Sequence, residues 1–138
     1  MLYYKPPMNI DFIILAAGKG TRMGGDSPKV LANLAGKPMI QHLINTIDSF
    51  PKSRTSIIVG HKAKDVEAGI LSSKKINFIH QKKQLGTAHA VKQALPYLKK
   101  NSTSLILYGD APLVEKTTLK KLINSAAKGN LSLLTFIK

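Results

Sequence analysis

The sequence predicts an α/β fold, a Rossmann-like and mostly parallel sheet with helices on both faces. Three observations carry this prediction. Short runs of β-branched and apolar residues alternate along the chain with amphipathic segments, as in strand–helix–strand units. The first run, residues 10–17, is apolar enough to be buried on both faces. A glycine-rich basic loop follows it directly, and right-handed crossovers would place the successive strands side by side.

The pattern also gives the order of the elements. Strands are expected at residues 10–17, 55–60, 76–80, 105–108 and 131–137. Helices are expected at 38–50, at 63–71, from Thr87 as cap to Pro96, and from Thr117 or Thr118 to Gly129. A sheet that ends with the strand 131–137 would have an unpaired edge, so we expect copies of the chain to associate into a homo-oligomer.

Composition limits the class of protein. The 138 residues are enough for one domain with a buried core, and the first seven are expected to be a disordered extension because Pro6 and Pro7 cannot join a ladder. Cysteine is absent, which excludes disulfides and thiol catalysis and makes a reducing cytoplasm the expected location. The longest apolar run, 12–17, is far below the roughly 20 residues of a membrane span.

The charge is strongly positive, with 21 Lys and Arg against 7 Asp and Glu and a net charge of +14. Such a balance raises the question of nucleic acid. The basic residues are scattered, however, aromatics make up only 6% of the chain, and Trp is absent, so a base-stacking surface is poorly supplied. We therefore interpret the charge as a solvated surface that favours small polyanions, and expect neither a nucleic acid nor a membrane as partner.

The loop within residues 15–31, LAAGKGTRMGGDSPKVL, sets four glycines among Lys19, Arg22 and Lys29. Glycine lets backbone N–H groups approach anionic oxygens, and fixed cations balance a triphosphate. The dinucleotide pattern fails because Met23 stands at the third glycine, and the Walker A pattern fails because Asp26 follows the last one. A different class of phosphate loop is predicted; the alternative is a glycine turn with solvated lysines.

This loop resembles the signature of the sugar-phosphate nucleotidyltransferases, most closely the uridylyltransferase half of the bacterial bifunctional N-acetylglucosamine-1-phosphate uridylyltransferase and glucosamine-1-phosphate acetyltransferase. The matching residues are Leu15, Ala16, Ala17, Gly18, Gly20, Thr21, Arg22, Met23, Pro28, Lys29, Val30 and Leu31. The resemblance covers residues 8–138 as the nucleotide-binding part of the catalytic domain. The sugar-binding part and the acetyl-transferring β-helix have no counterpart, so we expect a truncated form or a short relative.

The resemblance implies roles for individual residues. Arg22 would face the leaving pyrophosphate and Lys29 would contact phosphate, which makes these two the catalytic residues. Gln81, with the backbone near Gly86 and Thr87, would bind the uracil base. Without the resemblance, Gln81 is interpreted as a surface residue and Gly86 and Thr87 as a helix cap. The full nucleotide-binding set is Leu15, Ala16, Ala17, Gly18, Gly20, Thr21, Arg22, Lys29, Gln81, Gly86, Thr87, Tyr108 and Gly109.

Asp110 is the candidate metal ligand. It comes directly after the apolar run 105–108, at the end of a predicted strand. Mg²⁺ commonly takes one or two carboxylates and completes its shell with phosphate oxygens. Taken alone, Asp110 is better interpreted as a turn residue before Pro112; the resemblance reverses that preference and favours the metal. The four histidines have no ligand spacing and are expected to be structural or exposed.

The reaction implied by the resemblance is transfer of UMP from UTP to a sugar-1-phosphate, with N-acetylglucosamine-1-phosphate the expected acceptor, in cell-envelope (peptidoglycan) precursor synthesis. UTP and the sugar-1-phosphate are the expected partners and Mg²⁺ the cofactor. The acceptor is already an anion, so no general base is needed. Alternatives are a nucleotide-binding fragment without turnover, a guanylyl or cytidylyl transferase of the same fold, and a basic nucleic-acid binder.

Overall fold

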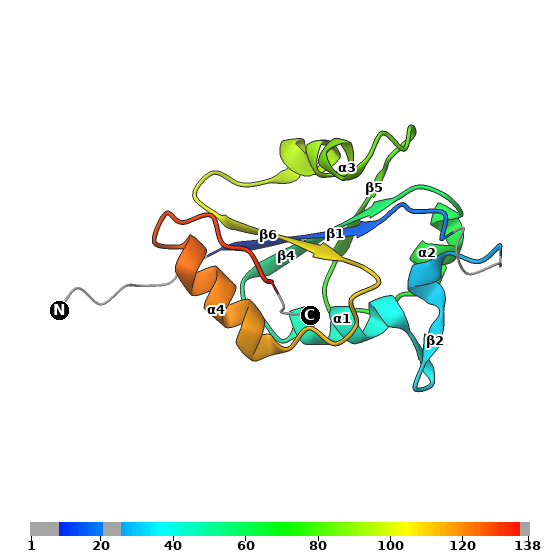
Figure 1. Cartoon of the computed structure of the whole chain (residues 1–138), viewed down its shortest axis with the longest axis horizontal. Coiled ribbons are helices and arrows are strands. Elements are labelled where there is room, and N and C mark those ends of the chain that lie inside the picture. Colours follow the sequence, from blue (N-terminus) through cyan, green and yellow to red (C-terminus); the bar gives the residue numbers. More distant parts are fainter. Residues whose placement is uncertain (1–8, 21–25, 136–138) are drawn as a thin grey trace.

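The computed structural model describes residues 9–20 and 26–135, so the extension expected at 1–7 lies outside the described part. Four parallel strands form the central sheet in the order β5-β4-β1-β6 (Figure 1). Their bounds are β1 Ile10–Ala16, β4 Ser53–Val59, β5 Ile76–His80 and β6 Thr103–Tyr108. The prediction of an α/β fold with a parallel sheet is confirmed.

Helices cover both faces of the sheet. In Figure 1, α1 (Met39–Asp48) and α4 (Lys116–Ala126) lie below the sheet, and α3 (Thr87–Ala94) lies above it. A short helix, α2 (Ala63–Ala68), connects β4 to β5 and packs on the same side as α1 through Val66. Pro96 ends α3 as expected, since a 3₁₀ turn at Leu95–Tyr97 follows.

The core has two parts because β1 is buried on both faces. Phe12 and Ile14 face the larger part, where α1 contributes Ile40, Leu43, Ile44 and Ile47 and α4 contributes Leu119 and Ile123. Ile13 faces the smaller part, against Ala90 and Ala94 of α3. This burial on both faces explains why residues 10–17 read as a continuous apolar run rather than an alternating one.

A small hairpin between β1 and α1 was not predicted. Its strands are β2 (Asn33–Leu34) and β3 (Lys37–Pro38), and they pair antiparallel. Ala35 and Gly36 both have positive φ, the backbone that two-residue hairpins require. The Asn33 carboxamide oxygen accepts a hydrogen bond from the Gly36 N–H at 2.9 Å, which stabilises the turn.

Two sequence predictions are wrong. Residues 131–135 form no strand, and the remaining part of the predicted strand 131–137 lies outside the described residues. Leu131, Leu133 and Leu134 are exposed, so β-propensity there was not matched by a ladder partner. Within the described residues, the outer strand on this side of the sheet is therefore β6, whose exposed Ile106 alternates with buried neighbours. Thr87 also does not cap α3, because Gly86 holds the cap position and no side chain caps the helix.

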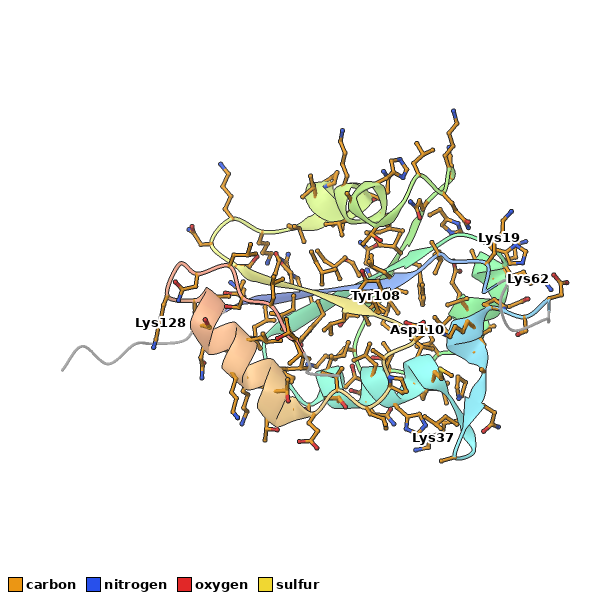
Figure 2. All side chains as sticks on the ribbon, in the orientation of Figure 1. Lys19, Lys37, Lys62, Tyr108, Asp110 and Lys128 are labelled. Atoms are coloured by element: carbon orange, nitrogen blue, oxygen red, sulfur yellow. The ribbon has the colours of Figure 1, made fainter. Side chains whose placement is uncertain are left out.

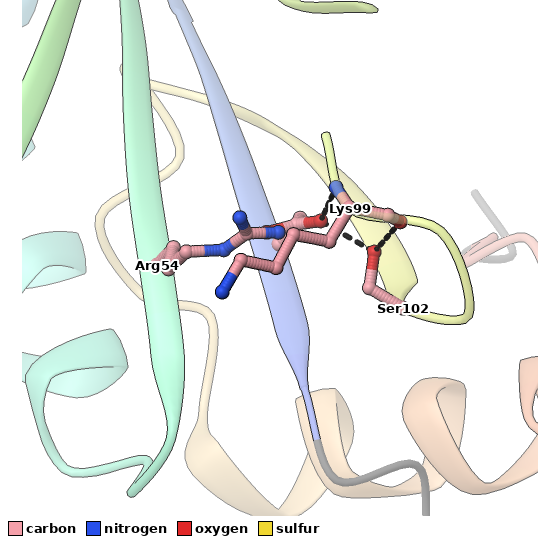
Figure 3. A network of polar contacts seen from close by, with 4 residues as sticks. Arg54, Lys99 and Ser102 are labelled. Atoms are coloured by element: carbon pink, nitrogen blue, oxygen red, sulfur yellow. Dashed lines mark hydrogen bonds and ion pairs between the residues drawn. The ribbon is translucent and has the colours of Figure 1, made fainter. Parts of the chain in front are cut away.

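A buried carboxylate ties the amino-terminal ends of the strands together (Figure 3). Asp11 on β1 is 3% exposed and forms an ion pair with Arg54 on β4. It also accepts hydrogen bonds from the Ser102 hydroxyl and, at 3.3 Å, from the Lys99 N–H. A buried charge is tolerated only with such partners, so this network serves the fold at the end of the sheet opposite the loops described next.

Candidate nucleotide-binding site

The three loops singled out from the sequence meet at one cavity of about 560 Å³ at the carboxyl ends of β1, β5 and β6. Ligands of open α/β sheets bind at this edge. The register explains the meeting, since Leu15 pairs with Tyr108 across β1 and β6. The cavity is lined by Leu15, Ala16, Ala17, Gly18, Gly20, Lys29, Val30, Gln81, Gln84, Gly86, Thr87, Ala90, Tyr108 and Asp110.

The predicted site residues divide into three groups. Eleven of them are among the residues that line this cavity. Gly109 lies beneath it instead, where its N–H donates to the Leu15 carbonyl oxygen at 3.0 Å. A Cβ at Gly109 would come within 2.9 Å of Val30 Cγ1, so close packing requires glycine there. Thr21 and Arg22 lie outside the described residues.

Lys29 and Asp110 form the charged centre of the cavity. The Lys29 Nζ lies 2.7 Å from Asp110 Oδ2, although the two residues are 81 positions apart. Lys29 begins the 3₁₀ turn Lys29–Leu31 after Pro28, and Asp110 follows β6, so the loops after two neighbouring strands supply one charge each. Figure 2 shows Asp110 beyond Tyr108 toward the end of the molecule where Lys19 also lies.

Asp110 has the chemistry of a Mg²⁺ ligand. Its side chain is 35% exposed and lines the cavity, so its carboxylate is open to a cation and to phosphate oxygens. Within residues 9–20 and 26–135, no three acidic or histidine side chains gather into a metal cluster. A hard cation with one protein carboxylate and phosphate ligands fits this donor set.

The glycines of the basic loop differ in what they are needed for. Gly20 has φ of +63°, and a Cβ there would approach Lys29 Cβ to 3.0 Å, so the loop returns against Lys29 only because residue 20 has no side chain. At Gly18 a Cβ would meet no atom within 4 Å, although this residue lines the cavity. Space at Gly18 is therefore open to a ligand rather than filled by the protein.

Gln81 and Gln84 form the wall on the side of β5 and α3. The Gln81 N–H donates to the Val59 carbonyl oxygen at 2.8 Å, which fixes its backbone at the end of β5, and its side chain is only 5% exposed. Gln84 Nε2 donates to the Ala17 carbonyl oxygen at 2.5 Å and thereby ties this wall to the end of β1. Gly86 has φ of +96°, which any other residue would adopt only with strain.

A second ion pair lies beside the basic loop. Lys62, just before α2, donates to Asp26, and His61 Nε2 lies 3.7 Å from the same carboxylate. The hydrogen bond and charge of Lys62 hold the pKa of Asp26 below its ordinary value of 3.8. Asp26 is 84% exposed, so this contact is screened by solvent and contributes little to stability.

Four residues of the site were not in the predicted set. Val30, Gln84 and Ala90 line the cavity, and His89 contacts Gln81 from behind it. His89 lies in the first turn of α3, and no pattern in the sequence indicated that its ring would reach Gln81. Its half-buried ring in contact with Gln81 fits the expectation that the histidines are structural or exposed.

Among the helices of the described part, none has the length and apolarity to cross a lipid bilayer.

The sheet order, the glycine-rich loop and the charged cavity at the strand ends define a nucleotidyltransferase domain. The chain belongs to the MobA-like NTP transferase domain family, whose model matches residues 12–135. It is similar to the bifunctional protein GlmU of Cellvibrio japonicus, with 47% identity over 126 residues, and to that of Francisella philomiragia, with 46% over 130 residues. These matches cover 91% and 94% of this chain but 28% of each relative.

Solved structures show the same fold. HddC from Yersinia pseudotuberculosis, in a crystal structure with GMP-PN, superposes with a TM-score of 0.68 at 29% identity, covering 84% of this chain and 53% of that one. Rv0371c from Mycobacterium tuberculosis superposes with a TM-score of 0.72 at 20% identity, covering 86% and 60%. The second likeness supports the architecture alone.

Proposed function

We propose that this domain binds UTP with Mg²⁺ and transfers its uridylyl group to a sugar-1-phosphate, with N-acetylglucosamine-1-phosphate as the acceptor. The observation that carries the proposal is the convergence of Lys29, Asp110 and Gln81, from the loops after three strands, on one cavity. The similarity to the GlmU proteins supports the choice of substrate class. The chain spans 28% of the length of those relatives.

The geometry suits a reaction that needs alignment more than acid–base chemistry. A phosphate oxygen of the sugar-1-phosphate attacks the α-phosphorus of UTP, a new P–O bond forms, and pyrophosphate leaves with the electron pair of the broken bond. Lys29 would hold phosphate oxygens, as would backbone N–H groups of the loop at Gly18 and Gly20. Mg²⁺ held by Asp110 would supply charge neutralisation at the phosphates.

Binding of the nucleotide and the metal would replace the Asp110 partner of Lys29 with phosphate oxygens. In the structure Lys29 pairs with Asp110, and both side chains are partly exposed, 42% and 35%. A metal on Asp110 would compete for the carboxylate and leave the Lys29 ammonium to the triphosphate. The charge pair is thus proposed as a preformed site that keeps the two groups 2.7 Å apart until substrate and cation arrive together.

Pyrophosphate release tests the proposed reaction. The assay contains UTP, Mg²⁺ and N-acetylglucosamine-1-phosphate, with reactions lacking each component in turn. Release that needs all three supports uridylyl transfer. UTP binding without pyrophosphate release supports a nucleotide-binding module. RNA binding that is lost at high salt but is not displaced by UTP supports a nucleic-acid binder.

Guanine is the base to test against uracil, because the HddC structure contains GMP-PN. Gln81→Ala should weaken UTP binding by about 1 to 3 kcal/mol, the range for leaving a buried polar group without its partner. GTP binding as tight as UTP binding in the parent chain would contradict the uridylyl assignment.

A further inference from the structure

The amide of Gln81 has a defined orientation in the cavity wall. Its Nε2 lies 3.3 Å from the Gly86 carbonyl oxygen and 2.8 Å from His89 Nδ1. A carbonyl oxygen only accepts, so the group that faces Gly86 must be the NH₂ end of the amide. The Oε1 end therefore points the other way, and among residues 9–20 and 26–135 no group donates a hydrogen bond to it.

This orientation assigns a state to His89. Both ring nitrogens of His89 face amide NH₂ groups, Nδ1 that of Gln81 at 2.8 Å and Nε2 that of Gln93 at 3.3 Å. A neutral imidazole has one acceptor nitrogen, and the shorter contact assigns it to Nδ1, so that Nε2 carries the proton. The Gln93 NH₂ group then donates to the His89 carbonyl oxygen, 3.2 Å away. His89 lies in the first turn of α3 and is half-buried, and it is absent from the cavity lining. It acts on the cavity only through Gln81, whose side chain is 5% exposed.

We propose that His89 is a positioning residue that holds Gln81 with its acceptor oxygen toward a bound base, so that the site selects bases carrying a ring N–H. Uracil and guanine carry such an N–H, whereas cytosine and adenine present a ring-nitrogen acceptor at the corresponding place. An acceptor facing an acceptor leaves both unpaired and disfavours the complex. The inference rests on the proposed nucleotide site, and it adds the residue that sets its base preference.

The contact with Gly86 alone would not fix the orientation of the Gln81 amide, and the shorter contact with His89 adds the second restraint. An amide can turn over by rotation of its last torsion, and at 3.3 Å the bond to Gly86 is long. With His89 in its Nε2–H tautomer, an inverted amide would bring Oε1 against both the Gly86 carbonyl oxygen and the Nδ1 lone pair. Inversion would therefore require the ring proton to move to Nδ1 and would still leave Oε1 facing the Gly86 carbonyl oxygen. Without His89, both amide orientations become accessible, and the wall can present either a donor or an acceptor to the base.

The chain offers a matched set of variants. His89→Leu removes the acceptor while keeping an apolar side chain on α3. His89→Asn keeps an acceptor, because its Oδ1 can take the place of Nδ1. Gln93→Ala is the control, since Gln93 Nε2 lies 3.3 Å from the other ring nitrogen of His89 and does not line the cavity. Melting curves and far-UV circular dichroism identify any variant that loses the fold.

The experiment is calorimetric titration of each protein with UTP, CTP, GTP and ATP in Mg²⁺. We expect the parent to favour UTP over CTP, and His89→Leu to reduce that ratio about tenfold, with UTP weaker and CTP tighter. His89→Asn and Gln93→Ala should keep most of the ratio. An unchanged ratio in His89→Leu, or an equal loss for UTP and CTP, would show a merely structural role and overturn the inference.

The two proposals fail differently in this experiment. A parent chain that prefers GTP to UTP removes the uridylyl assignment, while the GTP to ATP ratio in His89→Leu still tests His89 by the same logic. A parent chain that selects UTP, with a ratio that does not respond to His89, keeps the proposed function and removes the inference. A parent chain that prefers CTP or ATP, or binds no nucleotide, contradicts both.

Discussion

Replacing Asp110 by Asn removes one negative charge from the cavity and keeps the size of the side chain. Lys29 loses its partner at 2.7 Å, but both side chains are partly exposed, so water can replace the lost contact. Ion pairs of this kind contribute about 0 to 1 kcal/mol. We therefore expect the free energy of unfolding to change by no more than about 1 kcal/mol.

The same substitution should change nucleotide binding in opposite directions with and without the metal. In EDTA, removal of the carboxylate frees Lys29 and removes repulsion of the triphosphate, so UTP should bind more tightly by about 1 kcal/mol, the interaction of two unit charges 4 Å apart in water. In Mg²⁺, loss of the charged ligand should weaken binding by about 1.5 to 3 kcal/mol, or tenfold to about 150-fold.

The assay is calorimetric titration with UTP in EDTA and in saturating Mg²⁺, for the parent and for Asp110→Asn. Asp65→Asn in α2 is the matched control, because it makes the same charge change at an exposed residue that does not line the cavity. If Mg²⁺ strengthens UTP binding by the same factor in Asp110→Asn as in the parent, Asp110 does not hold the metal and its proposed role is wrong.

Three further predictions concern other parts of the chain. Gly20→Ala should lower the melting temperature, because its Cβ would contact Lys29 and φ is positive, whereas Gly18→Ala should leave melting unchanged and weaken UTP binding; equal melting of the two variants would contradict this. Asp11→Ala should destabilise the fold by about 1 to 3 kcal/mol in urea unfolding, because it leaves partners of a buried carboxylate unpaired; a change below about 0.5 kcal/mol would mean that water replaces it. The depressed pKa of Asp26 means that its ion pair is formed above the ordinary aspartate range and is lost as the pH falls through that lowered pKa; a carboxyl NMR titration with a midpoint at or above 3.8 would contradict it.

The arrangement of the site could largely be predicted from the sequence. Parallel strands bring their carboxyl ends to one edge, so the residues that follow 10–17, 76–80 and 105–108 had to converge. The structure places Gly18, Gln81 and Asp110 around one cavity accordingly. What remained hidden was pairwise contact, because no pattern in the sequence indicates that Lys29 would reach Asp110 or that His89 would reach Gln81.

The two wrong predictions have different physical causes. The leucines at 131, 133 and 134 have strand-like propensity and alternation, but a strand also needs a neighbour to pair with. Thr87 has the composition of a cap, yet Gly86 takes that position with a backbone that favours glycine. In the first case the missing strand partner decided the outcome, and in the second the backbone conformation at residue 86 decided it.

Whether the cavity at the ends of β1, β5 and β6 takes the nucleotide can be decided by mapping NMR shift changes during titration with UTP and Mg²⁺. We expect changes at the backbone amides of Gly18, Gly20 and Gly86 and at the side-chain amide of Gln81. The amide of Lys128, which Figure 2 places at the opposite end of the molecule, should stay unchanged. Changes centred on α4 and Lys128, with those cavity signals unmoved, would show that the nucleotide binds elsewhere.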